Sequence, residues 1–274
     1  MRNDLTSKIS IALKPMTDIT RYGTVTLSSD KVTEFMEKRP RKSGLINGGV
    51  YVIDRTILKY MDTLGEKFSF ENDVLVPLAK EGTVFGFVHD NFFLDIGLPE
   101  DYAKAQYMLP ELQQNFSISR RDFSKYTTLM LDRDGVINRQ IKGGYVTKWS
   151  EFEFMPGILE MLASLAPKFR HIFIVTNQRG VGRGIFSVRE LESIHAQMLE
   201  VIRAHGGRID SIQCCTETDD LDPYRKPNAG MFHEMCYYHN DIRPEKTLMI
   251  GDSDSDVQFA KNCGCDCIQV KKYQ

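Results

Sequence analysis

The stretch Leu131-Asp132-Arg133-Asp134-Gly135-Val136-Ile137-Asn138 directly follows the apolar run 127–131. An apolar run of this length, bounded by charge and glycine, predicts a buried strand whose carboxyl end brings Asp132 and Asp134 to the surface. Side chains two positions apart on an extended segment point to the same side, so both carboxylates face one point. Two like charges this close need a cation between them or a proton on one of them. The pair predicts either a metal ion beside a nucleophilic carboxylate or an acidic turn that follows a strand.

Composition limits the possible classes of protein. The chain has 274 residues and a formal net charge of −2, which allows two domains with their own cores and gives no argument for nucleic acid as a partner. No apolar run approaches the roughly 20 residues of a membrane span, and the N-terminus lacks the layout of a signal peptide. We therefore expect a cytoplasmic protein without nucleic-acid or membrane partners. The six cysteines all lie in the last quarter without C-x-x-C spacing, which favours reduced thiols over disulfides.

Short β-type runs separated by turn-forming residues characterise residues 1–107 and predict an antiparallel or mixed sheet. A polar stretch with weak periodicity, 108–125, predicts a linker. The expected strands are 8–13, 23–27, 31–36, 48–53, 83–88 and 92–96, and the expected helices are 71–80 and one opened by Pro99.

Five phrases of this first unit resemble the sugar-phosphate half of the sugar-1-phosphate nucleotidyltransferases, especially those acting on mannose- or heptose-1-phosphate. These phrases are 21–25, 35–38, 44–51, 68–71 and 95–102. The resemblance implies a partial α/β nucleotidyltransferase-like domain. In it, Lys38 would neutralise the sugar phosphate, Asn47 would hydrogen-bond the sugar and Asp95 would be one of two Mg²⁺ ligands. A β-rich scaffold with ordinary surface charges is the alternative.

The nucleotide-binding parts of that family would lie before Met1. Its Gly-rich loop, whose backbone amides hold the nucleotide phosphates, has no convincing replacement here. We therefore expect a remnant or a truncation with a vestigial sugar-phosphate site and no transferase activity of its own. A partner chain that supplies the missing nucleotide-binding half is the other possibility, and the chain would then be a binding or assembly subunit.

Strand and helix signals alternate through residues 126–274. This alternation implies an α/β fold with a Rossmann-like parallel sheet and a site at the carboxyl ends of its strands. The expected strands are 127–131, 171–175, 209–214, 247–250 and 267–270, and the expected helices are 156–162, one opened by the capping box 187–190, 230–238 and one after 256.

Polar motifs fall at the ends of these strands. Thr176 could hydrogen-bond a phosphoryl oxygen, although it could also simply begin a loop. Lys226 precedes a proline and could neutralise Asp132 and a phosphoryl group, or it could be an ordinary surface residue in a loop. Asp252 directly follows a strand and suits Mg²⁺, with Asp256 one helical turn away as a ligand or as support for one.

In this order, nucleophile strand, threonine, lysine and acidic pair, the motifs resemble the phosphatases of the haloacid dehalogenase superfamily. The resemblance implies that Asp132 forms an aspartyl-phosphate and that Asp134 acts as general acid and then as general base. A proton donor at position 134 favours a phosphatase over an ATPase-like pump. The implied phosphoryl-holding residues are Thr176 and Lys226, and the implied Mg²⁺ site draws on Asp132, Asp134 through its carbonyl, Asp252 and Asp256.

Within that superfamily the phrases 132–138, 144–146, 152–157, 177–184 and 225–227 resemble the D-glycero-D-manno-heptose-1,7-bisphosphate 7-phosphatases. Histidinol-phosphate phosphatases share most of them. The resemblance implies a capless fold in which loops 139–149, 179–186 and 215–225 confer specificity, and Arg179 and Arg225 could meet a second phosphate. The implied substrate-binding residues are Gly144, Tyr145, Asn177, Gln178, Arg179 and Arg225.

One departure concerns zinc. Those relatives usually place Cys and His ligands in the loop before Arg225, whereas here Cys214 and Cys215 stand without a second pair, so we expect no zinc. The resulting hypothesis is a Mg²⁺-dependent phosphatase that removes the 7-phosphate of D-glycero-D-manno-heptose 1,7-bisphosphate for nucleotide-activated heptose synthesis. Its product, a sugar 1-phosphate, is the substrate of the transferase family that the first unit resembles. The alternative substrate is histidinol phosphate or another small phosphomonoester.

Overall fold

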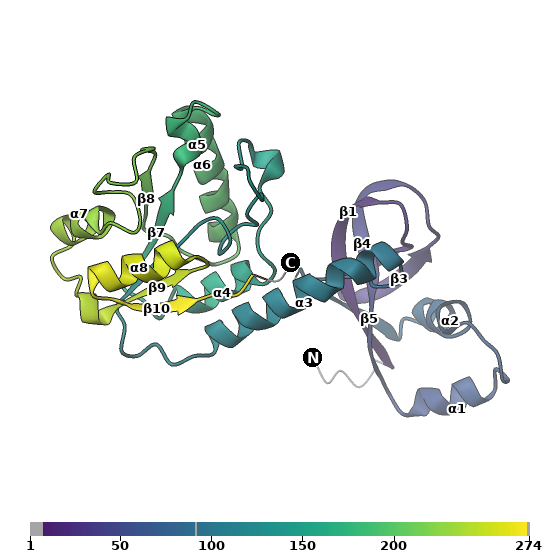
Figure 1. The fold of residues 1–274 in the computed structure, drawn as a ribbon. Helices are drawn as coiled ribbons and strands as arrows, with labels where there is room; N and C mark the ends of the chain where they lie inside the picture. The colour runs from purple at the N-terminus through teal and green to yellow at the C-terminus, as the bar shows by residue number, and fades with distance from the viewer. Residues whose placement is uncertain (1–7, 91, 273–274) are drawn as a thin grey trace. The chain divides into compact units, whose positions relative to one another are not determined.

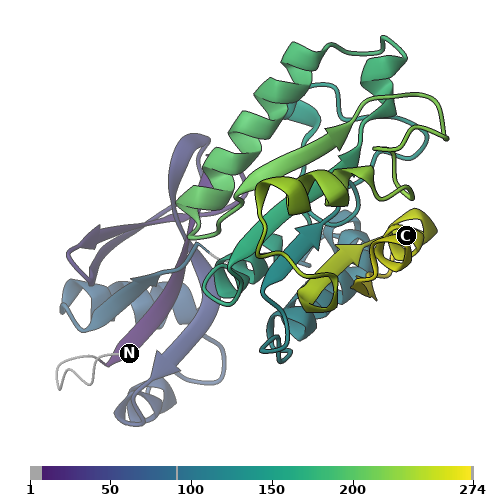
Figure 2. The ribbon, with the colours of Figure 1, turned by 90° about the vertical axis from the view of Figure 1, so that its left-hand side faces the viewer.

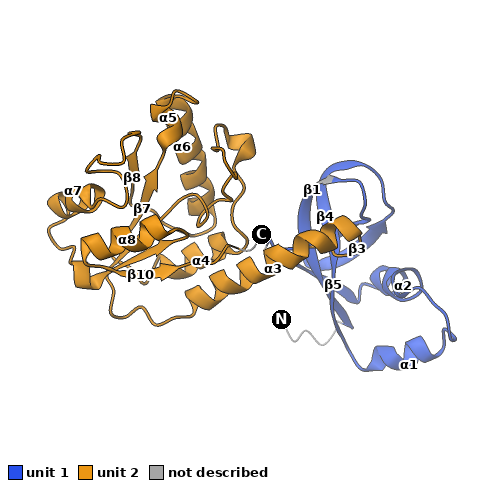
Figure 3. Cartoon of the chain, viewed as in Figure 1, with its two compact units in different colours: residues 1–93 blue, residues 94–274 orange. Residues whose placement is uncertain are grey.

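The computed structural model describes residues 8–90 and 92–272. The chain divides into two compact units, residues 1–93 and residues 94–274 (Figure 3). Among the described residues, no helix is both long enough and apolar enough to span a membrane.

The first unit is built around a closed barrel of five strands (Figure 1). The strand order is β1-β4-β2-β3-β5, and every pairing is antiparallel except the parallel pair β1–β5. Helical segments between β4 and β5 pack on the barrel, and side chains such as Ile9, Val74 and Leu75 are fully buried between them. The elements are β1 (Ile9–Ile19), β2 (Thr24–Ser28), β3 (Lys31–Met36), β4 (Arg41–Ile53), α1 (Thr56–Asp62), the π-helical turn η1 (Phe70–Leu75), α2 (Val76–Lys80) and β5 (Val84–Val88).

Two features of this unit differ from the sequence prediction. Residues 92–96 form no strand; the described strands of the first unit close into a barrel, which leaves no edge at which a further strand could pair. Helix α1 was not predicted, since Ile57 is its only buried residue and a single apolar contact leaves no helical periodicity in the sequence.

The stretch predicted as a linker, 108–125, is mostly helical instead. Helix α3 (Pro99–Ser119) lies in the compact unit of residues 94–274. Its buried stripe includes two polar residues, which explains the weak hydrophobic periodicity. Glu111 accepts hydrogen bonds from both terminal nitrogens of Arg139 at 3.0 and 3.2 Å, and the Asn115 amide donates to the Pro156 carbonyl at 2.8 Å. Burial of these groups is stabilised by specific partners that the hydropathy pattern does not reveal.

The second unit contains the predicted parallel sheet. Its five strands lie in the order β10-β9-β6-β7-β8, and all pairs are parallel. This confirms an α/β fold with a parallel sheet for residues 126–274. The strands are β6 (Thr128–Leu131), β7 (His171–Asn177), β8 (Ser211–Cys215), β9 (Thr247–Gly251) and β10 (Asp266–Gln269).

Helices cover both faces of this sheet (Figure 2). Side chains alternate between the faces: Leu129 and Leu131 pack on one side with α4 and α6, whereas Met130 packs on the other with α7 and α8. Both sets are almost wholly buried, which accounts for the continuous apolar runs in the sequence. The remaining elements are the 3₁₀ turn η2 (Trp149–Glu151), α4 (Ile158–Leu165), the short α5 (Arg179–Gly182), α6 (Val188–Ala204), α7 (Gly230–Tyr238), the 3₁₀ turn η3 (Pro244–Lys246) and α8 (Asp254–Cys263).

Candidate active site

Four segments bring polar side chains to one cavity at the carboxyl end of the parallel sheet. Asp132 follows β6, Thr176 lies at the end of β7, Lys226 comes from the loop after β8 and Asp252 follows β9. All four line a cavity of about 180 Å³. The structure therefore brings together side chains that are up to 120 positions apart in the chain (132 to 252).

A buried lysine joins two buried carboxylates at the floor of this cavity. Lys226 Nζ lies 2.8 Å from Asp132 Oδ1 and 2.6 Å from Asp256 Oδ1. The other oxygen of Asp256 accepts hydrogen bonds from the backbone N–H and the hydroxyl of Ser253 at 3.1 and 2.6 Å. Both carboxylate oxygens of Asp256 already accept hydrogen bonds. The geometry therefore favours a role in which Asp256 holds Lys226 in place over one in which it binds a metal directly.

Burial and charge set the protonation of this group. Burial raises the pKa of Asp132, the charges of Asp256 and Asp134 raise it further, and Lys226 opposes them, so the pKa is about 7. Burial by itself would lower the pKa of Lys226, but Asp132 and Asp256 outweigh it and the pKa is raised. Lys226 therefore stays protonated and acts as a fixed cation beside Asp132.

The cavity also offers oxygen donors that fit a hard divalent cation. Donor atoms of Asp132, Asp252 and Asp256 lie within 4.8 Å of one another. Oδ2 of Asp252 is buried and forms an ion pair with Lys272 Nζ, which lies 2.9 Å away. Burial raises the pKa of Asp252, and a cation bound to its carboxylate would lower this pKa again. Carboxylate oxygens gathered this closely are a donor set suited to Mg²⁺.

Gly135 leaves the space that this donor set needs. Its φ is +90°, and a Cβ at this position would overlap Oδ2 of Asp252. Only glycine combines this backbone conformation with such a close approach. The chain therefore turns sharply after Asp134 and lets the loop pack directly on Asp252.

Asp134 is held by three donors. Its carboxylate accepts hydrogen bonds from Arg133 at 2.9 Å, from the Asn138 amide at 2.9 Å and from the Gln178 amide at 2.7 Å. Burial raises the pKa of Asp134, but the charge of Arg133 and these hydrogen bonds prevail, so the pKa is lowered. In this resting geometry Asp134 is ionised and immobilised.

Behind Asp134 lies a buried pair that sequence reasoning missed. Arg133 is fully buried and donates through its other terminal nitrogen to Nε2 of His195 at 3.2 Å. Burial and then Arg133 lower the pKa of His195 to about 4, so the ring stays neutral and can accept this hydrogen bond. The available signal was the position of a charged residue between two aspartates at the end of an apolar strand.

The predicted substrate-binding residues fall into three groups. Gly144, Tyr145 and Asn177 line the cavity. Gln178 is buried and donates both to Asp134 and to the Thr176 hydroxyl at 2.9 Å, so it positions those groups. The cavity is also lined by Gln140, Ile141 and Val146 from the loop 139–149, which was expected to confer specificity, and by Ser253 and Ser255, which were not predicted.

The two predicted arginines form the third group, and they share one carboxylate. Arg225 Nε lies 3.1 Å from Oδ1 of Asp220, and Arg179 pairs with the same oxygen. The cavity lining does not include these arginines. Asp220 is exposed, whereas both arginines are mostly covered, so the acidic partner is the one in contact with solvent.

Two of the three residues predicted for the vestigial site line a cavity in the first unit. Lys38 and Asn47 lie there with Tyr51 and Glu71. The Asn47 amide donates to the Tyr51 hydroxyl at 2.7 Å, which orients it. Asp95 belongs to the second unit, where its carboxylate accepts from the Gly97 N–H at 2.9 Å.

Comparison with known proteins gives a consistent result for the second unit. A D-glycero-alpha-D-manno-heptose-1,7-bisphosphate 7-phosphatase of Mycobacterium bovis is 38% identical over 148 residues, which cover 52% of this chain and 78% of that protein. The chain belongs to this phosphatase family. The HAD-hydrolase-like family model matches residues 223–272 of the same phosphatase unit. A magnesium- and phosphate-bound D,D-heptose 1,7-bisphosphate phosphatase from B. bronchiseptica is 32% identical, with 52% of this chain and 78% of that one covered and a TM-score of 0.49.

The first unit matches a different family. The Nucleotidyl transferase model covers residues 2–111. A D-glycero-alpha-D-manno-heptose 1-phosphate guanylyltransferase of Aneurinibacillus thermoaerophilus is 45% identical over 98 residues, 36% of this chain and 42% of that protein. The chain thus spans about two fifths of that relative's length. It joins a phosphatase unit to part of a nucleotidyltransferase-like unit.

Proposed function

We propose that the chain is a Mg²⁺-dependent phosphatase that removes the 7-phosphate of D-glycero-D-manno-heptose 1,7-bisphosphate. The observation that carries the proposal is the position of Lys226, 2.8 Å from Asp132 in the cavity that Asp134 and Asp252 also line. A carboxylate, a fixed cation and a proton carrier around one cavity are the parts that phosphoryl transfer through a covalent intermediate requires.

In the first step an oxygen of Asp132 attacks phosphorus, and the bond from phosphorus to the sugar oxygen breaks. Oδ1 of Asp132 is held by Lys226 and by the backbone N–H of Arg133 at 2.8 Å, which fixes the orientation of the carboxylate. The negative charge of the bound phosphoryl group raises the pKa of Asp134, which takes up a proton from solvent and then gives it to the leaving sugar oxygen. The products are the dephosphorylated sugar and an aspartyl-phosphate at Asp132.

In the second step water attacks the phosphorus of the aspartyl-phosphate. Asp134, now ionised, removes a proton from that water, and the bond between phosphorus and the Asp132 oxygen breaks. Inorganic phosphate leaves and the free carboxylate returns. Throughout, Lys226 neutralises charge on the phosphoryl oxygens, and the Thr176 hydroxyl donates a hydrogen bond to one of them.

Asp132, the carbonyl of Asp134 and Asp252 would hold Mg²⁺. When bound, the ion supplies positive charge that neutralises the phosphoryl group and orients it toward Asp132. Asp256 would act indirectly, because its ion pair with Lys226 keeps the lysine beside the nucleophile.

Recognition of the rest of the substrate would fall to the loops around the cavity, as expected of a capless member of the superfamily. Tyr145 and Asn177 line the cavity and would contact the sugar. Arg179 and Arg225 share the exposed carboxylate of Asp220, so a second phosphate could replace Asp220 as their partner.

A substrate panel tests this function. Phosphate release should be fastest from one of the two anomers of the heptose 1,7-bisphosphate, should stop on chelation of divalent ions and should return with Mg²⁺. Faster release from histidinol phosphate than from either anomer would overturn the substrate assignment while leaving the phosphatase chemistry intact.

For the first unit we propose binding of a sugar phosphate without nucleotide transfer. The cavity that contains Lys38 and Asn47 supports this second function, because it pairs a cation with an oriented amide. The product of the phosphatase, a sugar 1-phosphate, would be the ligand, in agreement with a role in nucleotide-activated heptose synthesis. Calorimetry with heptose 1-phosphate should show binding that Lys38→Ala weakens. If a separate nucleotide-binding chain co-purifies and restores transferase activity, the unit would instead be one half of a split enzyme.

A further inference from the structure

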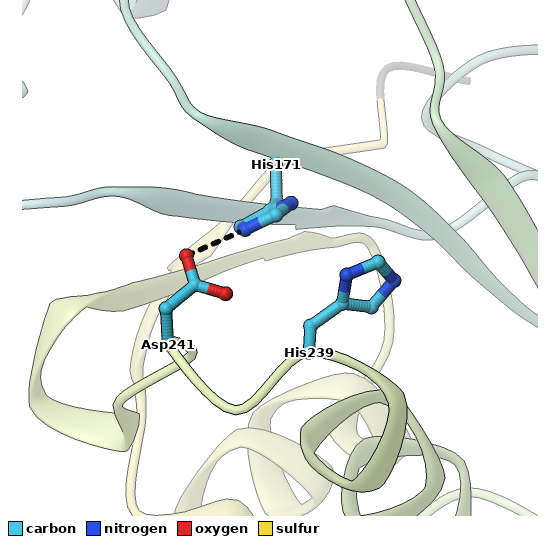
Figure 4. Close-up of side chains that lie close together, drawn as sticks. All are labelled: His171, His239 and Asp241. Atoms are coloured by element: carbon cyan, nitrogen blue, oxygen red, sulfur yellow. Dashed lines mark hydrogen bonds and ion pairs between the residues drawn. The ribbon is translucent and has the colours of Figure 1, made fainter.

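A second group of metal-ligand side chains lies at the opposite end of β7 from the active site. His171 is the first residue of this strand, whereas Thr176 lies at the end that reaches the catalytic cavity. His239 and Asp241 come from the turn that follows α7 (Figure 4). One donor atom from each of these three residues lies within 4.8 Å of the others. The phosphatase proposed above uses none of the three.

We propose that His171, His239 and Asp241 bind one divalent transition-metal ion of the zinc class. Two imidazoles and one carboxylate form the nitrogen and oxygen donor set that zinc, cobalt and nickel prefer, whereas Mg²⁺ and Ca²⁺ prefer oxygen alone. Three protein ligands leave a fourth position for water. The site is separate from the loop of Cys214 and Cys215, for which the sequence predicts no zinc.

The spacing of the donors is close to what such an ion requires. Nε2 of His171 lies 2.9 Å from Oδ2 of Asp241. A tetrahedral ion about 2.1 Å from each donor separates the donors by about 3.4 Å, so an ion can replace the shared proton of this pair with little movement. Figure 4 shows the ring of His239 beside the pair, with one of its nitrogens on the side that faces His171. A donor nitrogen of His239 lies within 4.8 Å of the donor atoms of His171 and Asp241.

Packing holds both imidazoles in place. The ring of His171 stacks on Phe173 with centroids 5.8 Å apart, and the ring of His239 packs on the same Phe173 at 5.4 Å. Phe173 is fully buried, so both rings pack against a side chain that its neighbours enclose. The backbone of His239 is fixed as well, because its N–H donates to the Met235 carbonyl at 2.9 Å. Ligands held in advance lose little conformational entropy when a metal binds.

The competing explanation is that the cluster only ties β7 to the turn after α7. Arg170 supports that explanation, because its Nε lies 3.0 Å from Oδ2 of Asp241 and so completes a purely protein-based network. The two explanations assign opposite roles to this arginine. In a metal site Arg170 is a competitor, since it repels an incoming cation and occupies the carboxylate. In a structural network it is a stabilising partner.

Co²⁺ is a suitable probe, with the full chain kept in excess Mg²⁺ so that the catalytic cavity is occupied. Calorimetry should show one Co²⁺ or Zn²⁺ per chain, and the visible spectrum of bound Co²⁺ should lack the thiolate charge-transfer band that any of the cysteines would produce. Both His239→Ala and Asp241→Asn should abolish this binding. The exposed His233 on α7 supplies the control, and His233→Ala should bind as the wild type does.

Arg170→Ala provides the decisive comparison, because the side chain is exposed and its removal should not unfold the protein. We expect affinity for Co²⁺ to increase about two- to fivefold, the size of an exposed charge interaction. All four variants should keep the Mg²⁺-dependent phosphatase rate. The proposal is overturned if the wild type shows no saturable binding, if His239→Ala binds unchanged, or if Arg170→Ala fails to bind more tightly.

Discussion

The Nζ atom of Lys226 lies 2.8 Å from Oδ1 of Asp132, and the two side chains are only 3% and 12% exposed. Oδ1 of Asp256 lies 2.6 Å from the same ammonium group. Burial raises the pKa of Asp132 to about 7 although Lys226 opposes this shift, so without the cation the nucleophile would be protonated at neutral pH. Lys226 is therefore a positive charge that two carboxylates hold in place at the lining of the catalytic cavity.

Lys226→Met should remove this charge while keeping most of the side-chain volume. The pKa of Asp132 should rise above about 7, kcat should fall at least about 10²-fold, and the uncompensated carboxylates should lower the free energy of unfolding by about 3 to 5 kcal/mol. Steady-state kinetics and urea unfolding measure both effects. The matched control is Lys246→Met on the exposed turn η3, which should change neither. Near-normal turnover in Lys226→Met would contradict the assigned role.

Asp132→Asn should abolish covalent catalysis and leave the fold intact. The amide keeps the shape of the side chain but is not a nucleophile, so kcat should fall at least about 10³-fold. Acid quenching during turnover should trap phosphate on the wild-type chain and none on the variant. Phosphate trapped on the variant would show that another residue is the nucleophile.

Arg133→Lys should move the pH dependence of the reaction. Arg133 lowers the pKa of Asp134 and also reaches His195, and a lysine cannot make both contacts. The pKa of Asp134 should therefore rise, so the proton needed for the leaving group persists to higher pH and the basic limb of kcat/KM shifts upward. The pH–rate profile measures this shift. An unchanged basic limb would mean that Asp134 is not the general acid.

His195→Gln should protect the protein against acid. Folding lowers the pKa of His195 from 6.5 to about 4, so between these values the unfolded chain binds more protons and the wild type loses stability as pH falls. The loss between about pH 7.5 and about pH 5 should be about 1 to 2 kcal/mol larger for the wild type than for the variant. Glutamine can still accept the hydrogen bond from Arg133. Urea unfolding at the two pH values gives the comparison, and parallel curves would argue against a buried neutral imidazole.

Gly135→Ala should damage the proposed metal site. The positive φ alone costs about 1 to 2 kcal/mol, and the overlap with Asp252 adds to that and displaces a proposed ligand. Gly206→Ala is the control for backbone strain, since its φ is +82° and its Cβ would only touch Ala163 at 3.8 Å. Affinity for Mg²⁺, measured by calorimetry, should fall in the first variant and stay constant in the second. Equal affinity in both would remove the link between Gly135 and the metal site.

Much of the site follows from local sequence patterns. Apolar runs that alternate with helical periodicity predicted the parallel sheet, and the residues directly after the runs, such as Asp132 and Asp252, reach one cavity because parallel strands end at the same edge. The positions of Arg133 and His195 could not be predicted in this way. They are 62 positions apart and meet only through the packing of α6 on the loop after β6.

The sequence by itself determined the order of strands and helices in the second unit and the polar residues at the strand ends, because hydrophobic alternation and turn residues act over a few positions. Tertiary structure alone decided which of these residues touch. In the stretch expected to be a linker, Glu111 of helix α3 pairs with Arg139. Asp256 forms an ion pair with Lys226. Arg179 and Arg225 both pair with Asp220. The physical reason is that a charged side chain can be buried only if a partner compensates its charge, and that partner can lie at any distance along the chain.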